Sequence, residues 1–517
     1  MIIPAIRYAA VTVLVSAALQ PAQAPSPVQP GAGERGRGGR VNPLALLYTE
    51  RCAPCHGTDV TPGRAPTLFD DEWTRGADDD SIVRNITNGI ATTEMIPFKD
   101  LLTEQQIWQL VTYIRMQAGS LKPRPPLADP DGQAIKSERQ TFRIEVVARD
   151  LETPWALAFL PDGRLLITER PGRLRIVDKG RLLPDPVKNI PKVWERQDGG
   201  LLDVEVHPQY ASNGWIYLGY SETLPGYKPP PADAAPPTPP PAAQGGRGGG
   251  PPSIPSMTVV VRGKINRSHE WVDQQILFRA PPGLYTPVNA HYGLRFIFDK
   301  ENHLFYTIGE RNVVMDAQDL SKPTGKIHRV NDDGSVPKDN PFVDRPDAVA
   351  SIWSYGHRHP QGLAWDPATG KLWESEHGPQ GGDEINIIER GRNYGWGVIT
   401  HGIERGITKR AEEGMEQPVV YFTPTIAPAG MSFYSGTRYP GWKNSLFVGG
   451  LGGQQLRRLE ISADKVTHQE VVFNQFGRVR DIVVGPDGLF YVALQLPGKV
   501  LSQSTAGMVV RLVPVGE

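Results

Sequence analysis

The chain has 517 residues, and its 55 lysines and arginines almost balance its 56 aspartates and glutamates. The formal net charge of −1 provides no general field for nucleic acid or anionic lipid, so neither is an expected partner. The length favours more than one domain. The 55 glycines and 50 prolines favour many short strands and turns over long helices.

The first 24 residues, MIIPAIRYAAVTVLVSAALQPAQA, have the pattern of a signal peptide. Arg7 precedes an apolar run, and the sequence from Ala22 to Ala24 fits a small-x-small cleavage site. The run is too short for a comfortable membrane span, although an uncleaved anchor is the alternative. We therefore expect a periplasmic or secreted protein with no membrane span in the mature chain, which begins with a flexible segment at 25–40.

The two cysteines of the chain, Cys52 and Cys55, stand in the motif Cys-x-x-Cys-His, which ends at His56. A disulfide across so short a loop would hardly restrict the unfolded chain. No βαβ pattern for a redox motif surrounds the cysteines, and zinc would need a fourth ligand. The motif instead predicts two thioether attachments for haem c, with His56 as the proximal iron ligand.

A second iron ligand is suggested by the downstream stretch NITNGIATTEMIPF. This stretch resembles the Gly-rich, Pro-flanked loop of class I cytochromes c, which implies Met95 as the distal ligand. A buried core methionine is the alternative for Met95. Ligation by His and Met raises the haem potential, so the haem is expected to accept electrons from a more reducing group.

The stretch LTEQQIWQLVTYIRMQ then predicts a closing helix. Thr103 is a suitable N-cap with Gln106 three residues on, and apolar residues recur at helical spacing at Ile107, Leu110, Val111 and Ile114. The resemblance to class I cytochromes c covers residues 41–119, which we expect to form a small all-α domain. Residues 120–140 are polar and Pro-containing, as in a linker.

From 141 to 517 one unit recurs, in which an apolar strand, a turn and a second apolar strand follow one another. Copies start at Pro154, Gly200, His291, Pro360, Ala429 and Val479. Each unit is too small to bury its own apolar face, so neighbours must stack, which predicts an all-β six-bladed propeller. The early strand FRIEVVARDL is expected to complete the last blade, and the Pro/Gly-rich insertion 224–256 is expected to form a surface loop.

Four loop segments of this region carry candidate functional residues. Three of them are NAHYGL with His291, YGHRHPQGL with Arg358, and FGRVRDI with Arg478 and Arg480. The fourth, SEHGPQGGDEINIIERGRNYGW, offers Asp383, Glu384 and the carbonyls of a Gly-Pro turn, which are hard oxygen ligands suited to calcium. Arginines beside calcium favour a small ligand with several carboxylates, such as pyrroloquinoline quinone (PQQ), although a phosphate ester satisfies the same charges.

Residues 141–517 resemble the soluble aldose/glucose dehydrogenases that use PQQ. The matching stretches are HYGLRFIF, DDGSVPKDNPF, GHRHPQGL, GPQGGDEIN, NYGW, TPTIAPAGMSFY and RVRDI. The resemblance implies that His291 is the general base that takes the proton of the sugar C1 hydroxyl, and that Arg358 lies near the quinone carbonyls. The further roles that it implies are a calcium at PQQ on the carbonyls of Gly378 and Pro379, a second calcium at Glu384 and the carbonyl of Tyr394, and PQQ contacts from Thr425, Arg478 and Arg480.

Three positions depart from the pattern of this family. His359 stands where the family usually has Asn, Gly452 where many members have a lysine that reaches the cofactor, and Asp198, next to Gln197, where the family has glutamine. The first two concern the affinity for PQQ more than the fold. A structural role is the alternative for His291, and His207, His357 and His359 are interpreted as packing or hydrogen-bonding residues.

The function expected from both halves is that of a periplasmic quinohaemoprotein. It would oxidise an aldose at C1 to the lactone with PQQ and calcium, and pass electrons through haem c to a downstream redox partner such as a cytochrome or terminal oxidase. A calcium-dependent propeller hydrolase or lactonase is one alternative. The other is a degenerate ligand-binding propeller tethered to an electron-transfer cytochrome. The sequence specifies neither the sugar nor the acceptor.

Overall fold

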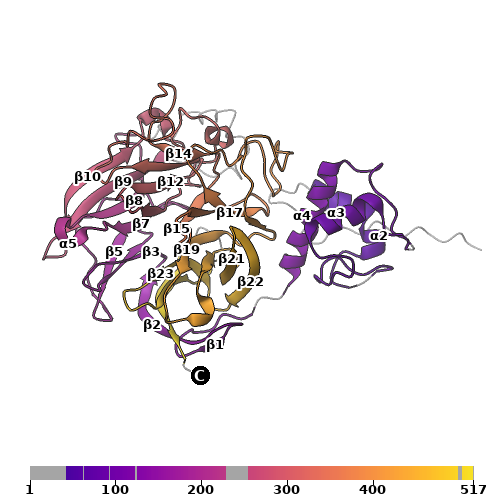
Figure 1. The fold of residues 1–517 in the computed structure, drawn as a ribbon, viewed down its shortest axis with the longest axis horizontal. Helices are drawn as coiled ribbons and strands as arrows, with labels where there is room; N and C mark the ends of the chain where they lie inside the picture. The colour runs from indigo at the N-terminus through magenta and orange to yellow at the C-terminus, as the bar shows by residue number, and fades with distance from the viewer. Residues whose placement is uncertain are drawn as a thin grey trace, which may run out of the picture.

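The computed structural model describes residues 42–61, 63–91, 93–122, 125–228, 254–498 and 504–515. A helical part lies beside a much larger ring of sheets (Figure 1). The expected signal peptide 1–24, the segment 25–40 and most of the insertion 224–256 lie outside the described residues. Within those residues, no helix has the length and apolar character needed to span a membrane.

The helical part has four helices in its described residues: α1 (Pro43–Arg51), α2 (Ala53–His56), α3 (Asp79–Asn88) and α4 (Glu104–Leu121). The predicted capping box opens α4, because the Thr103 side chain accepts from the backbone N–H of Gln106 and the Gln106 side chain accepts from that of Thr103. The apolar stripe predicted for α4 is buried against α1 and α3. The all-α expectation for this part is confirmed.

The strands of the described part of the chain form six antiparallel sheets, which are the blades of the ring. In chain order, the first three blades are β3 (Pro154–Phe159), β4 (Leu165–Glu169), β5 (Arg173–Asp178) and β6 (Arg181–Leu182); β7 (Leu201–Val206), β8 (Ile216–Thr223), β9 (Ser256–Ile265) and β10 (Trp271–Arg279); and β11 (Phe296–Phe298), β12 (Leu304–Ile308), β13 (Lys326–Val330) and β14 (Ile352–Tyr355). The fourth and fifth blades are β15 (Pro360–Trp365), β16 (Leu372–Glu376), β17 (Asp383–Ile388) and β18 (Val420–Phe422); and β19 (Pro428–Tyr434), β20 (Ser445–Gly450), β21 (Gln455–Ser462) and β22 (Lys465–Phe473).

The sixth blade closes the ring with strands from both ends of the propeller. It contains β23 (Arg478–Val484), β24 (Phe490–Gln495), β25 (Ala506–Pro514), β2 (Thr141–Glu152) and β1 (Ala134–Lys136). The innermost strands of successive blades contact one another, and β23 contacts β3. The predictions of six blades and of FRIEVVARDL as the closing strand are therefore confirmed, since β2 pairs with β25.

The expected linker 120–140 contains a short strand near its end. Its residues Ala134–Lys136 form β1, which pairs antiparallel with the start of β2. Ile135 packs against the core of the sixth blade and provides the apolar contact that fixes this short edge strand. The connection between the helical part and the propeller is correspondingly shorter.

The topology gathers particular loops at one end of the ring. In each blade the innermost strand runs the same way, so the connections from second to third strand and from one blade to the next emerge together.

Short helices lie in several connections: α5 (Tyr210–Asn213), η2 (Pro282–Leu284), η3 (Val314–Ala317) and η4 (Pro440–Trp442). The insertion falls between β8 and β9, where the Leu224 N–H donates to the Pro255 carbonyl at 2.8 Å.

A buried ionic group ties the innermost strands together near the ring axis. Arg295 Nη1 lies 3.1 Å from Asp203 Oδ1 on β7 and 3.1 Å from Asp481 Oδ1 on β23. Its guanidinium also lies 4.6 Å from the ring centroid of Trp155 on β3. Three blades and the loop before β11 therefore meet at a single arginine.

Candidate functional site

His291 lies in the loop that enters the third blade, with its ring held by a buried carboxylate. Its Nδ1 is 2.6 Å from Oε1 of Glu310, which is only 1 % exposed. Such a carboxylate favours the tautomer with the proton on Nδ1, so the Nε2 lone pair is available to accept a proton. The backbone N–H of His291 donates to Asp198 Oδ2 at 3.2 Å, which fixes the loop. This geometry suits a general base.

Two further histidines, His359 and His377, pack in series beside His291. The ring of His359 stacks on that of His291 with centroids 4.9 Å apart, and His377 meets His359 edge-on at 4.9 Å. Burial lowers the pKa of His359 well below its usual value and that of His377 to about 3, so both rings are neutral. His359 Nδ1 is buried without a hydrogen-bond partner in the described residues, and therefore offers a polar atom to a ligand.

Arg358 is fixed from both of its ends. Its backbone N–H donates to Glu376 Oε2 at 2.5 Å, and its Nη1 donates to the His377 carbonyl at 3.1 Å. The guanidinium lies 5.0 Å from the ring centroid of Trp396, while its Nε has no hydrogen-bond partner in the described residues. Arg358 is thus a positioned cation with donor capacity to spare.

Arg478 and Arg480, at the start of β23, are both buried and close to Arg170. Burial, together with repulsion from Arg170, lowers the pKa of Arg478 to about 10. Burial, then repulsion from Arg478 and Arg170, lowers the pKa of Arg480 well below its usual value. Arg170 is 1 % exposed and pairs with Glu195 at 3.0 Å. Buried positive charge in this excess calls for an anionic ligand.

The loop with Gly378 is joined to the loop with Thr425 through Asp383. Asp383 Oδ1 accepts from the Gly378 N–H at 2.9 Å. Its Oδ2 accepts from the Thr425 hydroxyl at 2.5 Å and from the backbone N–H groups of Ile426 and Ala427 at 2.6 and 2.7 Å. Asp383, which the sequence offered as a calcium ligand, thus accepts hydrogen bonds on both oxygens and positions the two loops.

Three glutamates converge beside this loop: Glu374 and Glu376 are buried, and Glu384 is half-buried. Asn386 Nδ2 lies 3.2, 3.5 and 3.3 Å from carboxylate oxygens of Glu374, Glu376 and Glu384. Burial, followed by repulsion from Glu376, raises the pKa of Glu374 and of Glu384 well above the usual value. A divalent cation would relieve this repulsion, and these oxygen ligands suit calcium. One small cavity is lined by Glu384, Tyr394, Gly378, Glu376 and Arg358.

His357 packs in the interior, and its Nδ1 lies 3.3 Å from Glu376 Oε1 in a group with Glu374 that could hold a metal ion, so its expected packing role stays a prediction. It is buried, its Nε2 is 2.9 Å from the Ser354 hydroxyl, and its ring stacks on Tyr394 with centroids 4.7 Å apart. His207 is likewise buried, and its Nδ1 accepts from the Gln209 N–H at 2.9 Å. Both histidines support neighbouring structure.

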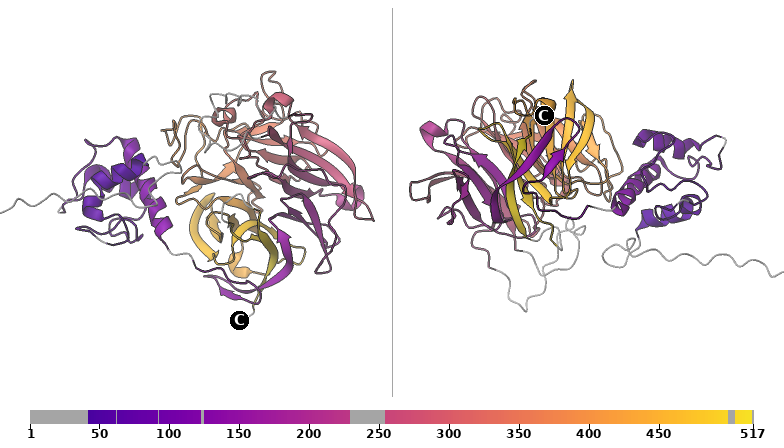
Figure 2. Two further views of the ribbon diagram at one scale, coloured as in Figure 1. Left: turned by 180° about the vertical axis from the view of Figure 1, so that it is seen from behind. Right: turned by 90° about the horizontal axis from the view of Figure 1, so that it is seen from below.

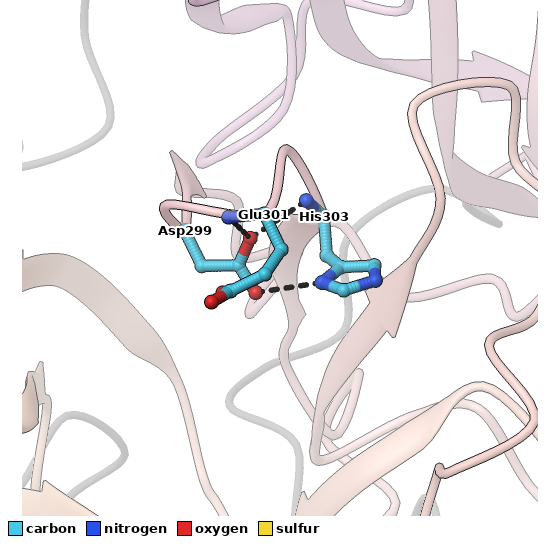
Figure 3. A group of neighbouring side chains, drawn as sticks. All are labelled: Asp299, Glu301 and His303. Carbon is cyan, nitrogen blue, oxygen red and sulfur yellow. Dashed lines mark hydrogen bonds and ion pairs between the residues drawn. The ribbon is translucent and has the colours of Figure 1, made fainter.

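A separate acidic group lies in the turn between β11 and β12, at the other end of the ring. It consists of Asp299, Glu301 and His303 (Figure 3). His303 Nδ1 is 2.8 Å from Asp299 Oδ2, and Arg329 Nη2 is 3.0 Å from the same nitrogen. Asp299 and His303 hold each other in position, and the Arg329 guanidinium contacts His303. We interpret the arrangement as a turn stabilised by these contacts.

The helical part meets the chemical needs of a covalent haem. Cys52 and Cys55 are free thiols at the α1–α2 turn. His56 Nδ1 is 2.6 Å from the Pro66 carbonyl, which places the proton on Nδ1 and leaves the lone pair of Nε2 available to a metal. Cys52 and Met95 pack against the same apolar cluster as the buried face of α4. These residues fit the ligand set that the sequence predicts.

Some residues of the site have no local sequence signal. Glu310 and Arg170 follow the ends of β12 and β4 on the same end of the ring as His291 and Arg478. Each of the two residues follows the second strand of its blade, in a connection on the same end of the ring as the site. This position is the one sequence feature that could have identified them. The structure places His291, Arg358, Arg478 and Arg480 on this end as expected. Thr425 joins Gly378 there, and Glu384 lines a cavity with Tyr394.

Comparisons with known proteins agree with this layout. A family model described as Glucose / Sorbosone dehydrogenase matches residues 151–502. A model described as Cytochrome C oxidase, cbb3-type, subunit III matches residues 39–114. The aldose sugar dehydrogenase YliI of Escherichia coli is 39% identical over 368 residues, which cover 69% of this chain and 91% of that protein.

Solved structures give the same result. The soluble aldose sugar dehydrogenase of Escherichia coli in its apo form is 36% identical, with a TM-score of 0.62 over 72% of this chain and 100% of that chain. The PQQ-bound aldose sugar dehydrogenase of Streptomyces coelicolor is 25% identical, with a TM-score of 0.54 over 74% of this chain and 100% of that chain. The chain therefore belongs to the glucose/sorbosone dehydrogenase family of oxidoreductases, and it carries a cytochrome c domain ahead of the family's propeller.

Proposed function

We propose that this chain is an exported quinohaemoprotein that oxidises an aldose at C1 to its lactone. The observation that carries the proposal is the buried cluster of Arg170, Arg478 and Arg480, which lies at the same end of the ring as the His291–Glu310 pair. A base and a cationic cradle for a polycarboxylate are the two requirements of sugar oxidation with PQQ. When bound, PQQ would accept hydride from the sugar, and haem c would carry the electrons away singly.

The residues of the chain divide this work. His291, oriented by Glu310, accepts the proton of the sugar C1 hydroxyl at Nε2. Arg358 would stabilise negative charge that develops on the quinone carbonyls. A fixed cation interacts strongly with such a charge where water is excluded. Arg478 and Arg480 bind carboxylates, and the Thr425 loop completes the cradle.

Calcium has two proposed positions. The carbonyls of Gly378 and Pro379 would hold one ion at PQQ, where a Lewis acid stabilises developing charge. Glu384 and the carbonyl of Tyr394 would hold the other, and the raised pKa of Glu384 supports a cation there. Cys52 and Cys55 would attach haem c, with His56 and Met95 as axial ligands. A downstream cytochrome or terminal oxidase would take the electrons in the periplasm or outside the cell.

The two competing functions use less of the site. A lactonase would employ calcium and His291 but has no use for three buried arginines or for a haem. A ligand-binding propeller would not need Glu310 to fix the tautomer of His291. Neither alternative transfers electrons from a sugar, so both predict that an aldose does not reduce a dye or the haem.

The test is dye-linked oxidation by the full chain after loading with calcium and PQQ, with a panel of aldoses. We expect aldose-dependent dye reduction and lactone formation, which chelation abolishes and which only both components together restore. Full activity in an extensively chelated, quinone-free preparation would contradict the proposal. Hydrolysis of added lactone without dye reduction would instead support the lactonase.

A further inference from the structure

The helix α4 has two working faces. Its residues Ile107, Leu110, Val111 and Ile114 are buried in the cytochrome domain, in the cluster that also contains Cys52 and Met95. Its opposite face carries Trp108, Thr112 and Gly119, which meet loops of the fourth blade. α4 is the helix nearest the propeller, and α2, with the haem-attachment motif, lies beyond it (Figures 1 and 2).

The contact is close along the length of α4. A Cβ atom on Gly119 would overlap the ring of Pro424, so the helix backbone approaches the loop as only glycine allows. Nearer the start of the helix, a Cβ on Gly381 would lie 3.2 Å from Thr112 Cγ2. At each of these two points the backbone of a glycine in one domain lies against a side chain of the other domain.

Arg410 anchors the contact from the side of the propeller. Its guanidinium lies 4.0 Å from the ring centroid of Trp108 and 5.3 Å from that of Tyr421. The Arg410 Nη2 donates to His401 Nδ1 at 3.0 Å, and the ring of His401 stacks on Tyr421 at 4.5 Å. Arg410 is thus held by its own domain in the position where it stacks on the cytochrome.

A hydrogen bond adds a second connection. The Tyr421 hydroxyl donates to Asp79 Oδ2 at 2.9 Å, in the first turn of α3. Burial, together with the nearby Asp79, raises the pKa of Tyr421 to about 12, so this hydroxyl stays protonated at any physiological pH. Arg115 Nε holds the other oxygen of Asp79 at 3.0 Å.

The loops that α4 touches are those of the proposed cofactor site. Gly382 donates to the Thr423 hydroxyl at 3.2 Å, and Asp383 joins the Gly378 loop to the Thr425 hydroxyl. The helix whose buried face shares an apolar cluster with Met95 therefore contacts, with another face, the loops that carry Gly378 and Thr425.

We propose that this face of α4 is a docking surface that fixes the cytochrome domain on the quinone site, and that electrons cross it within one chain. Arg410 is its positioning residue. The inference rests on the proposed function. Each aldose gives up two electrons and two protons. The electrons reach the haem iron one at a time, ferric becoming ferrous, an external one-electron acceptor such as ferricyanide reoxidises the iron between steps, and the protons pass to solvent.

The first test compares Arg410→Ala with Arg405→Ala in the full chain loaded with haem, calcium and PQQ. Arg405 is an exposed arginine of the same loop and serves as the matched control. Under anaerobic stopped-flow conditions without ferricyanide, we expect a single-exponential haem reduction by sugar that is independent of protein concentration. Arg410→Ala should slow it about tenfold, because the cation–π contact of a half-buried arginine lies between the exposed and the desolvated cases, while dye-linked sugar oxidation is unchanged.

A rate that rises with protein concentration, or equal rates in Arg410→Ala and Arg405→Ala, would overturn the inference. Trp108→Ala tests the contact from the other side. It should slow haem reduction similarly, and the double variant should be no slower than either single one. Additive effects of the two substitutions would contradict a shared contact.

The second test does not depend on the proposed function. Hydrogen exchange of the quinone-free full chain should be faster over 104–121 and 419–425 in Arg410→Ala than in Arg405→Ala, with no change in the core strands. Equal protection in both variants would refute the docking surface. Absence of dye-linked activity in the loaded wild type would instead refute the proposed function and leave this measurement decisive for docking.

Discussion

At the scale of single residues, the candidate site combines groups that a local pattern can mark with groups that it cannot. His291, Arg358, Arg478 and Arg480 stand in motifs that resemble those of a known family, and all four lie where the loops gather. Glu310 is 19 residues from His291 and reaches it only because β12 returns the chain to the same end of the ring. Arg170 joins Arg478 from another blade. Pairing across blades is a property of the closed ring, which no short stretch encodes.

Gly452 gives a prediction about cofactor affinity. A Cβ at this position would lie 3.4 Å from the Ile426 carbonyl oxygen and 3.5 Å from Ala427 Cβ, which are ordinary contacts, so a side chain fits there. Lysine would restore the cation that many family members carry. We expect Gly452→Lys to lower the Kd for PQQ about tenfold or more, since a hydrogen bond to a charged group contributes roughly 1.5–3 kcal/mol.

The matched control for this prediction is Gly452→Gln, which has a similar reach but no charge. Titration of the calcium-loaded protein with PQQ, followed by absorbance, measures both variants. Equal affinity in the lysine and glutamine variants would show that position 452 does not face a carboxylate of the cofactor.

Asp203 gives a prediction about pH. Burial raises its pKa to about 7, with Arg295 opposing and Asp481 adding to the shift. An unfolded aspartate has a pKa of about 3.9, so the folded state alone binds this proton between the two values. The resulting stabilisation is complete below about pH 4 and is lost as the pH rises to about 7, at a limiting slope of about 1.4 kcal/mol per pH unit.

Asp203→Asn should therefore show a smaller loss of propeller melting temperature from pH 4 to pH 7 than the wild type. Asparagine retains an acceptor for Arg295, and Asp481 keeps the charge partner of that arginine. The exposed Asp344→Asn serves as the control. Parallel pH profiles for the wild type and Asp203→Asn would contradict the binding of a proton by Asp203 in the folded state.

At the scale of elements, five of the six predicted copy starts lie within one residue of a first blade strand, because each blade repeats an apolar strand, a turn and a second apolar strand. The third copy was placed at His291, whereas β11 begins at Phe296. The capping box of α4 was equally predictable, since its signal lies within four residues. β1 was not, because Ala134–Lys136 is only three residues long, with no alternation of apolar and polar residues, and forms a strand only by pairing with β2. The face of α4 with Trp108, Thr112 and Gly119 likewise has no sequence pattern that predicts a contact. The loops that contact it lie about 300 residues away in the chain.

The loop between α3 and α4 carries a prediction about the haem. Met95 packs in the cluster of Cys52 and α4, whereas Met116 lies on α4 outside that cluster. Met95→Ala should remove the His/Met absorption signature and lower the reduction potential of the haem, because a thioether ligand raises it. Met116→Ala should leave both unchanged. Retention of the signature in Met95→Ala would exclude Met95 as the axial ligand.

At the scale of the whole molecule, the proposed function gives the two domains complementary roles. The proposed site would take electrons from sugar in pairs and would need an outlet, and the cytochrome domain packs against the loops of that site through α4. The resemblance to two families made the pairing predictable. The way in which the domains touch was not, because Asp79, Trp108 and Gly119 gain their partners only in the folded chain. The cofactor ligands themselves remain predictions.

The central claim is that sugar electrons enter through His291 and leave through the haem. Its most direct measurement is the anaerobic absorption spectrum of the haem after addition of an aldose to the fully loaded protein. The wild type should show the bands of ferrous haem. His291→Gln should keep its ferric spectrum with sugar, yet turn ferrous with dithionite. Haem reduction by sugar at the wild-type rate in His291→Gln would contradict the account.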